Sequence, residues 1–135
     1  MEVEANIANV AILDEYVAHA LEEHGVDHKS KQQIKLALEE ILVNVASYAY
    51  PEDKGTMAVD LAISDNVVTL QISDSGLPFD PSNAKEPDIS LSAEERDIGG
   101  LGVFLVQKLM DDMVYERKDE KNILTITKTF TPDSA

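Results

Sequence analysis

The order of its apolar patterns constrains the fold of this chain more than any other feature. Apolar residues recur every three or four positions in three segments, as in amphipathic helices, and alternate with polar residues in four others, as in strands buried on one face. The expected helices cover residues 6–24, about 30–49 and 100–111, and the expected strands cover 57–63, 67–73, 113–117 and 123–130. This order predicts an α+β two-layer sandwich, with helices on one face of a mixed, mostly antiparallel sheet.

Cap and turn residues separate these segments. Ser30 and Gln33 have the spacing of a capping box before the second helix, and Ser64-Asp65-Asn66 predicts a hairpin between the first two strands. The stretch from Leu77 to Asp97 contains three prolines and little periodicity. A loop of that length in a compact domain is usually functional or disordered. Because no repeat, low-complexity tract or linker divides the chain, we expect a single domain over residues 1–135.

The charge balance excludes one class of partner. Asp and Glu outnumber Lys and Arg by 26 to 11, for a net charge of −15, whereas binding to nucleic acid requires clustered basic residues. A basic protein partner would suit this surface, although the charge can equally serve solubility. Cysteine is absent, which excludes disulfides and thiolate metal sites. Without a long apolar run or a signal peptide, we expect a cytoplasmic protein with no membrane contact.

Two motifs carry candidate chemistry. Glu40 and Asn44 lie one helical turn apart, at the rim of the apolar stripe of the second expected helix. The Asn oxygen can ligate Mg²⁺ and the carboxylate can orient or deprotonate a hydroxyl, although a solvated helix face has the same spacing. Asp74 follows a strand directly, so its carboxylate can accept a hydrogen bond from the exocyclic amine of adenine, while Gly76 lets a ligand approach the backbone. The alternative for this second motif is an ordinary turn.

A glycine cluster precedes the third expected helix. Gly99, Gly100 and Gly102 can leave backbone N–H groups free to meet phosphate oxygens at the positive end of that helix. A flexible hinge is the alternative. No Gly-Lys-Ser or Gly-Lys-Thr follows, so the cluster is not a Walker-type loop, and the strand-turn-helix context of the dinucleotide fingerprint is missing.

Taken in this order, the segments resemble the GHKL (Bergerat-fold) ATPases. LALEEILVNVASYAY is similar to the N-box of that family, DSGLPFDP to its first glycine box, IGGLGVFLVQKLMD to its second, and NILTITK to its closing strand. The resemblance runs from about Ile7 to Phe130. Within the family, the short free-standing form resembles the anti-sigma-factor serine/threonine kinases rather than the sensor histidine kinases.

The resemblance implies ATP and Mg²⁺ as cofactors and a role for each motif residue. Glu40 would orient or deprotonate the acceptor hydroxyl, and Asn44 would bind Mg²⁺. Asp74 would bind the adenine amine, with Gly76 making room and Thr125 assisting. The glycines of the second box would pack against the phosphates, and the loop of about residues 77–98 would form a lid. Two lid cations, Lys85 and Arg96, are candidates for neutralising the phosphates, with a plain surface role as the alternative.

The resemblance also implies partners. Such a kinase would hold a sigma factor inactive and phosphorylate a serine of an anti-anti-sigma (STAS-type) protein in partner-switching control of transcription, and the resemblance also implies a homodimer. The chain departs from the family at Tyr48, where many relatives place histidine and where we expect an aromatic at the edge of the core. Only residues 2–5 remain for the strand that often opens the fold. Two alternatives stay open: a non-catalytic nucleotide-binding interaction module, and a stand-alone catalytic domain of the histidine-kinase type.

Overall fold

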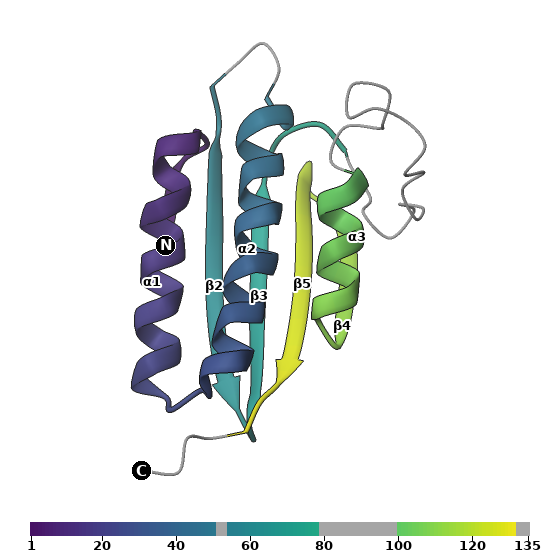
Figure 1. Cartoon of the computed structure of the whole chain (residues 1–135). Helices are drawn as coiled ribbons and strands as arrows, with labels where there is room; N and C mark the ends of the chain where they lie inside the picture. Colours follow the sequence, from purple (N-terminus) through teal and green to yellow (C-terminus); the bar gives the residue numbers. More distant parts are fainter. Residues whose placement is uncertain (51–53, 79–99, 132–135) are drawn as a thin grey trace.

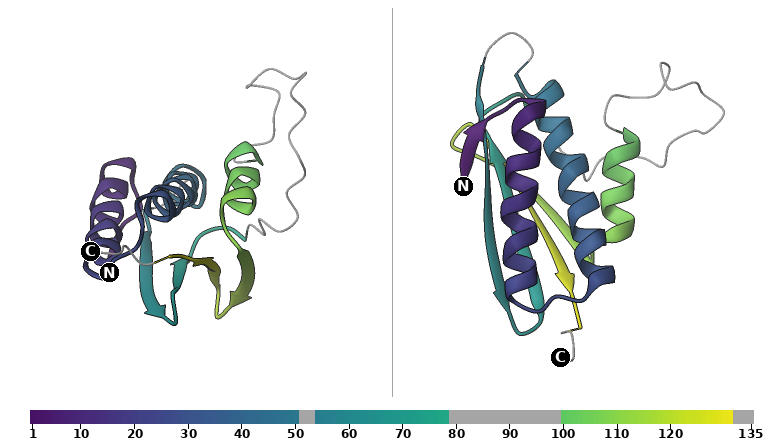
Figure 2. Two further views of the ribbon diagram at one scale, coloured as in Figure 1. Left: turned by 60° about the horizontal axis from the view of Figure 1, so that its bottom comes forward. Right: turned by 60° about the vertical axis from the view of Figure 1, so that its left-hand side comes forward.

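The computed structural model describes residues 1–50, 54–78 and 100–131, which form two layers. The five strands form one antiparallel sheet in the order β1-β2-β3-β5-β4. The three helices of the described part of the chain lie on one face of this sheet, with α2 between α1 and α3 (Figures 1 and 2). The predicted α+β sandwich is confirmed. In chain order the elements are β1 (Glu2–Glu4), α1 (Ile7–Glu23), α2 (His28–Tyr48), β2 (Thr56–Ser64), β3 (Val67–Asp74), α3 (Gly100–Leu109), β4 (Asp112–Lys118) and β5 (Lys121–Thr129).

The two long helices begin at side-chain caps. Asn6 caps α1 by accepting a hydrogen bond from the backbone N–H of Asn9 at 2.8 Å. Asp27 caps α2 by accepting from the N–H of Ser30 at 3.1 Å. The predicted capping box at Ser30 and Gln33 was therefore wrong, because the cap lies three residues earlier and Ser30 is buried inside the first turn.

Both hairpins close with two-residue turns. Asp65 and Asn66 have φ angles of 53° and 62°, and Asp119 and Glu120 have 52° and 64°. Two consecutive residues at positive φ are typical of the type I′ turn, whose twist matches that of the flanking strands. The predicted hairpin between the first two strands is confirmed, and its register brings Ser64 opposite Val67.

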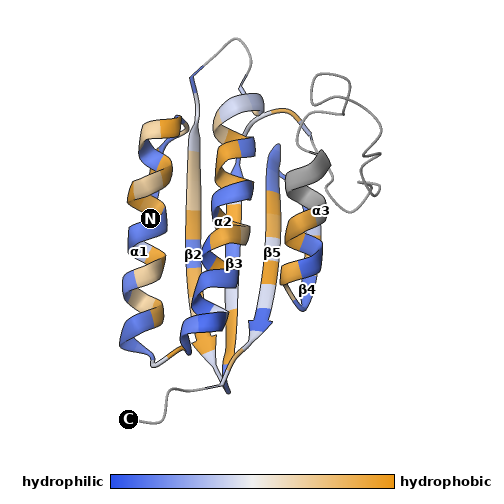
Figure 3. Ribbon diagram, viewed as in Figure 1, coloured by the Kyte–Doolittle hydropathy of each residue, from blue (hydrophilic) through white to orange (hydrophobic). Residues whose placement is uncertain are grey.

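The core fills the space between the helices and the sheet, where the apolar sides of the helices and strands meet (Figure 3). On the strands, buried residues alternate with more exposed ones, so that a single face of the sheet is apolar. No helix within the described ranges combines the length and apolarity needed to cross a membrane. The largest fully buried side chains are Leu13, Val17 and Leu21 of α1, Ile34, Leu38 and Leu42 of α2, and Met57, Val59, Val68, Leu70, Ile72 and Ile126 of the sheet.

Candidate functional site

A row of side chains crosses four strands at one end of the sheet. In the strand register, Met57 lies opposite Asp74, Asp74 opposite Asn122, and Asn122 opposite Arg117. Asp74 continues the alternation of the buried residues of β3, so this row belongs to the face that the helices cover. The C-terminal end of α2 and the N-terminal end of α3 lie at the same end of the molecule (Figure 1). An apolar face therefore ends in polar groups where two helix ends meet.

The two polar residues at the centre of this row are buried and bonded to each other. Asp74 is 8% exposed and Asn122 is 7% exposed. The Oδ1 atom of Asp74 accepts hydrogen bonds from the Nδ2 of Asn122 at 2.9 Å and from the backbone N–H of Gly76 at 2.8 Å. Both hydrogen bonds that the Asp74 side chain makes to described residues thus fall on one carboxylate oxygen. A carboxylate held in this way presents Oδ2 as an acceptor in a fixed direction.

The turn that follows, residues 74–77, is fastened to its surroundings. The N–H of Leu77 donates to the carbonyl of Ala49 at 2.9 Å, and the N–H of Ser75 donates to the hydroxyl of Tyr50 at 2.7 Å. That hydroxyl donates in turn to the carbonyl of Thr56 at 2.6 Å. Burial raises the pKa of Tyr50, so the phenol stays protonated and keeps this role. These bonds fix the start of the first glycine box against the end of α2.

Gly76 has a packing role at this contact. A Cβ atom added at Gly76 would lie 2.3 Å from the carbonyl oxygen of Ala49 and 2.6 Å from its Cβ. The room left by the missing side chain is therefore occupied by Ala49, the residue that caps the C-terminal end of α2. The predicted function of Gly76, to let a ligand approach, stays a prediction beside this structural one.

Helix periodicity places Glu40 and Asn44 on the flank of α2 that faces α3. Lys31 forms an ion pair with Glu22, and Lys35 lies 4.0 Å from Asp14, so this side of α2 faces α1. Glu40 follows Lys31 by nine positions and Asn44 follows Lys35 by nine. Nine residues turn an α-helix by about 900°, which brings a side chain to the opposite flank. Because α1 and α3 lie on opposite sides of α2, both predicted residues face α3 and are half-buried (Figure 1).

The second glycine box lies partly within the described ranges. Gly100 and Gly102 are in the first turn of α3, whose N-terminal end carries the positive helix dipole. Gly99, Lys85, Arg96 and the predicted lid after residue 78 lie outside the described residues.

Tyr48 and Thr125 do not lie where the sequence predicted. Tyr48 is 46% exposed, so the expectation that it lies at the edge of the core was wrong. Thr125 is not brought to Asp74. It alternates with the buried Leu124 and Ile126, which places it on the face of the sheet that the helices do not cover.

Asn122 is the β5 residue that reaches Asp74, and the sequence reasoning missed it. No local sequence signal could have found it, because β3 and β5 are not joined by a turn and only their antiparallel register in the structure puts Asn122 opposite Asp74 on one side of the sheet. The predicted strand began at residue 123, one position too late to include it.

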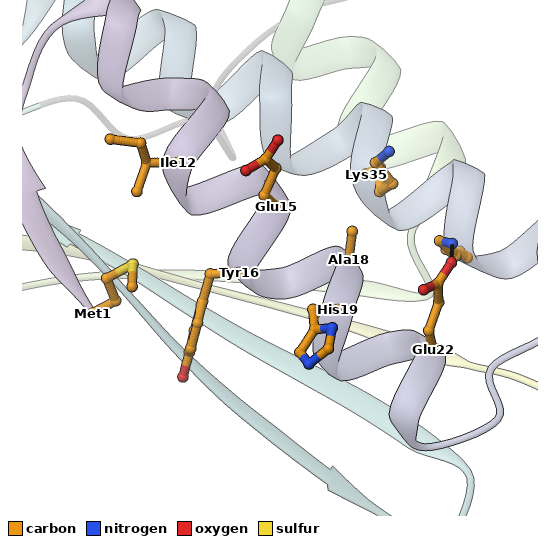
Figure 4. A pocket seen from close by; sticks show the side chains of 9 residues that line it. Met1, Ile12, Glu15, Tyr16, Ala18, His19, Glu22 and Lys35 are labelled. Carbon is orange, nitrogen blue, oxygen red and sulfur yellow. Dashed lines mark hydrogen bonds and ion pairs between the residues drawn. The ribbon is translucent and has the colours of Figure 1, made fainter.

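A hollow on the surface lies away from these residues. Its lining includes Met1 next to β1, four residues of α1 (Ile12, Tyr16, His19 and Glu22) and Lys35 of α2 (Figure 4). None of the predicted site residues contributes to it. Among the described residues, no three His, Asp or Glu side chains cluster as a metal site would require.

Comparison with known proteins gives the family. A model of the histidine kinase-like ATPase domain matches residues 3–128. The serine-protein kinases RsbW of Bacillus thuringiensis (strain Al Hakam) and Bacillus cereus (strain 03BB102) are each 30% identical over 132 residues, covering 95% of this chain and 82% of theirs.

Solved structures agree in fold. The mycobacterial sensor histidine kinase MprB has a TM-score of 0.55 at 16% identity and covers 98% of this chain and 100% of its own. The histidine kinase AdeS of Acinetobacter baumannii has a TM-score of 0.54 at 13% identity and covers 97% of this chain and 68% of its own. With the family model spanning most of its length, this chain belongs to the histidine kinase-like ATPase domains, the GHKL family that its motifs resemble.

Proposed function

We propose that this protein is an ATP-binding anti-sigma regulatory factor with serine/threonine kinase activity toward an anti-anti-sigma protein. The observation that carries the proposal is the anchored carboxylate of Asp74 at the sheet end where α2 and α3 meet. The similarity to RsbW, whose name is that of a serine-protein kinase, supports the choice of acceptor. As a regulator of transcription, it would act in the cytoplasm.

The residues present fit a nucleotide. Oδ2 of Asp74 is an acceptor for an amine donor such as the 6-amino group of adenine, because Oδ1 is already bonded to Asn122 and Gly76. Asn44 offers a neutral amide oxygen of the kind that Mg²⁺ accepts beside phosphate oxygens. Mg²⁺, when bound, would neutralise phosphate charge. The backbone at Gly100 and Gly102 faces the phosphates in this proposal, at the positive end of α3.

Glu40 is the proposed catalytic residue. It lies one helical turn before Asn44 on the same flank of α2, so a hydroxyl near the metal-bound phosphate would also be near this carboxylate. Glu40 would orient the serine hydroxyl and accept its proton. Phosphoryl transfer depends mainly on positioning and charge neutralisation, which these groups supply.

A basic segment of a sigma factor is the proposed regulatory partner. The net charge of −15 favours a partner with a cationic surface, which it would attract over a long range. The anti-anti-sigma protein would compete for the same kinase, and its phosphorylation would restore inhibition. We expect binding to weaken as salt rises from about 50 to 500 mM, since exposed charges are screened. A homodimer is a further proposal that rests on the resemblance alone, and light scattering tests it.

The first experiment measures nucleotide binding by calorimetry with and without Mg²⁺. Asp74→Asn removes the charge-assisted acceptor, and we expect ATP affinity to fall about 10- to 100-fold. Asn44→Ala should weaken the binding of ATP with Mg²⁺ more than without it. Asp60→Asn, an exposed residue of β2, is the control for loss of one carboxylate. No binding by the folded native chain would contradict the proposal and favour a protein-interaction domain.

The second experiment follows labelled phosphate from ATP to the partner. Label on a serine of the anti-anti-sigma protein should be lost in Glu40→Gln and kept in Glu39→Gln, the neighbouring exposed carboxylate of α2. Acid treatment distinguishes the acceptors, because phosphoserine survives it and phosphohistidine does not. Nucleotide binding without any transfer would identify the non-catalytic module instead.

A further inference from the structure

Asn122 contacts the proposed adenine-binding carboxylate but has no role in the function proposed so far. It is a buried amide at the start of β5, opposite Asp74 on the helix-covered face. Its Nδ2 group donates to Oδ1 of Asp74 at 2.9 Å and to the carbonyl of Leu77 at 2.8 Å. Its Oδ1 accepts from the hydroxyl of Tyr115, on β4, at 2.5 Å. One side chain therefore connects three strands and the turn of residues 74–77.

This network fixes the orientation of the amide. Asp74 Oδ1 and the Leu77 carbonyl are both acceptors, so only the NH₂ side of Asn122 can face them. The Tyr115 hydroxyl, which donates, can only face the carbonyl side. A flipped amide would place oxygen against oxygen at two contacts. The direction of the amide dipole at Asp74 is thus set from both sides.

The consequence appears at the carboxylate. With two N–H groups on Oδ1, rotation of the Asp74 carboxylate would leave the hydrogens of Asn122 and Gly76 without their acceptor. Oδ2 is held as the acceptor that remains for a ligand. Such an acceptor matches the 6-amino group of adenine and opposes the 6-oxo group of hypoxanthine, which is itself an acceptor.

We propose that Asn122, held by Tyr115, is a positioning residue that fixes Asp74 and thereby sets the preference for a 6-amino purine over a 6-oxo purine. This inference rests on the proposed function, because it requires that Asp74 read the base. Asn122 acts through Asp74 and does not itself contact the purine in this proposal. Without it, Asp74 can rotate or take up water, and the distinction between donor and acceptor at the base is weakened.

The test compares ATP with inosine triphosphate, which replaces the 6-amino group by an oxo group. Dissociation constants are measured by calorimetry for the native chain, Asn122→Ala and Tyr115→Phe. We expect the native chain to prefer ATP by at least about 10-fold, Asn122→Ala to reduce this ratio to about 1 to 3, and Tyr115→Phe to give an intermediate ratio. A purely structural role would weaken both nucleotides equally and leave the ratio unchanged.

Controls separate the possible failures. Gln71→Ala changes an exposed residue on the other face of β3 and should keep the native ratio. If Asn122→Ala does not fold, as judged by circular dichroism, Tyr115→Phe alone decides, since it removes one hydroxyl and keeps the ring. A native ratio in the folded variants would overturn this inference and leave ATP binding intact. No nucleotide binding by the native chain would overturn both the inference and the proposed function.

Discussion

Substituting Gly76 by alanine tests the close contact between the first glycine box and α2. Ordinary van der Waals contact begins near 3.4 Å, so a Cβ atom placed 2.3 Å from the Ala49 oxygen is about 1 Å too close. The obstacle is a backbone carbonyl, which cannot move aside as a flexible side chain can. Relief requires the turn to move, and a shift of about 1 Å breaks the 2.9 Å hydrogen bond from Leu77 to Ala49. Overpacking costs about 2 kcal/mol and the lost hydrogen bond about 1 kcal/mol, so Gly76→Ala should lower the free energy of unfolding by about 3 kcal/mol.

Urea denaturation followed by circular dichroism measures this loss in the free energy of unfolding. In thermal denaturation, the same loss should lower the melting temperature by about 10 °C. Gly25→Ala is the matched control. Gly25 has a φ of +70° and no atom within 4 Å of an added Cβ, so only backbone strain of about 1 kcal/mol opposes alanine there. Adding Ala49→Gly should not rescue Gly76→Ala, because the carbonyl remains. A loss below about 0.5 kcal/mol in Gly76→Ala would refute the steric reasoning.

Three further predictions concern stability. Hydrogen bonding to Ser30 lowers the pKa of Asp27, so the ionised carboxylate stabilises the fold above the unfolded pKa of 3.8, and this effect is lost as pH falls through the lower folded pKa. Asp27→Ala should therefore lower the free energy of unfolding, measured by urea titration, by about 1 kcal/mol at pH 7 and by less near pH 2. Desolvation raises the pKa of Asp14, whose buried Oδ1 has no hydrogen-bond partner among the described residues, so its ionised form destabilises the fold as pH rises above 3.8. Asp14→Asn should therefore raise the free energy of unfolding, measured by urea titration, by about 1 kcal/mol at pH 7 and by less at pH 4. A lower free energy of unfolding at pH 7 would contradict this reasoning. Glu120→Gly should raise the melting temperature by relieving a φ of 64°, with a gain of about 1 kcal/mol, whereas an unchanged melting temperature would show that the turn carries no strain.

Sequence reasoning located most of the elements because their signals are local. The apolar stripe of α1 and the Asp65-Asn66 turn each depend on residues that are close in sequence. The error at the start of α2 was also local: two capping signals lay three residues apart, and the structure uses Asp27. The site roles of Glu40, Asn44 and Asp74 stay predictions, made from the chemistry of their side chains and from the resemblance of their order to a known family.

The sequence by itself determined the alternation of helices and strands and the residue types available for nucleotide chemistry, since periodicity and side-chain chemistry are properties of short segments. Only the tertiary structure decided which of these residues meet. Asn122 and Asp74 are 48 positions apart, and their contact depends on the register of β3 with β5. A shift of one residue would send Asn122 to the other face of the sheet, where Thr125 lies. Burial of the apolar face selects one register, and that choice places an amide beside the carboxylate.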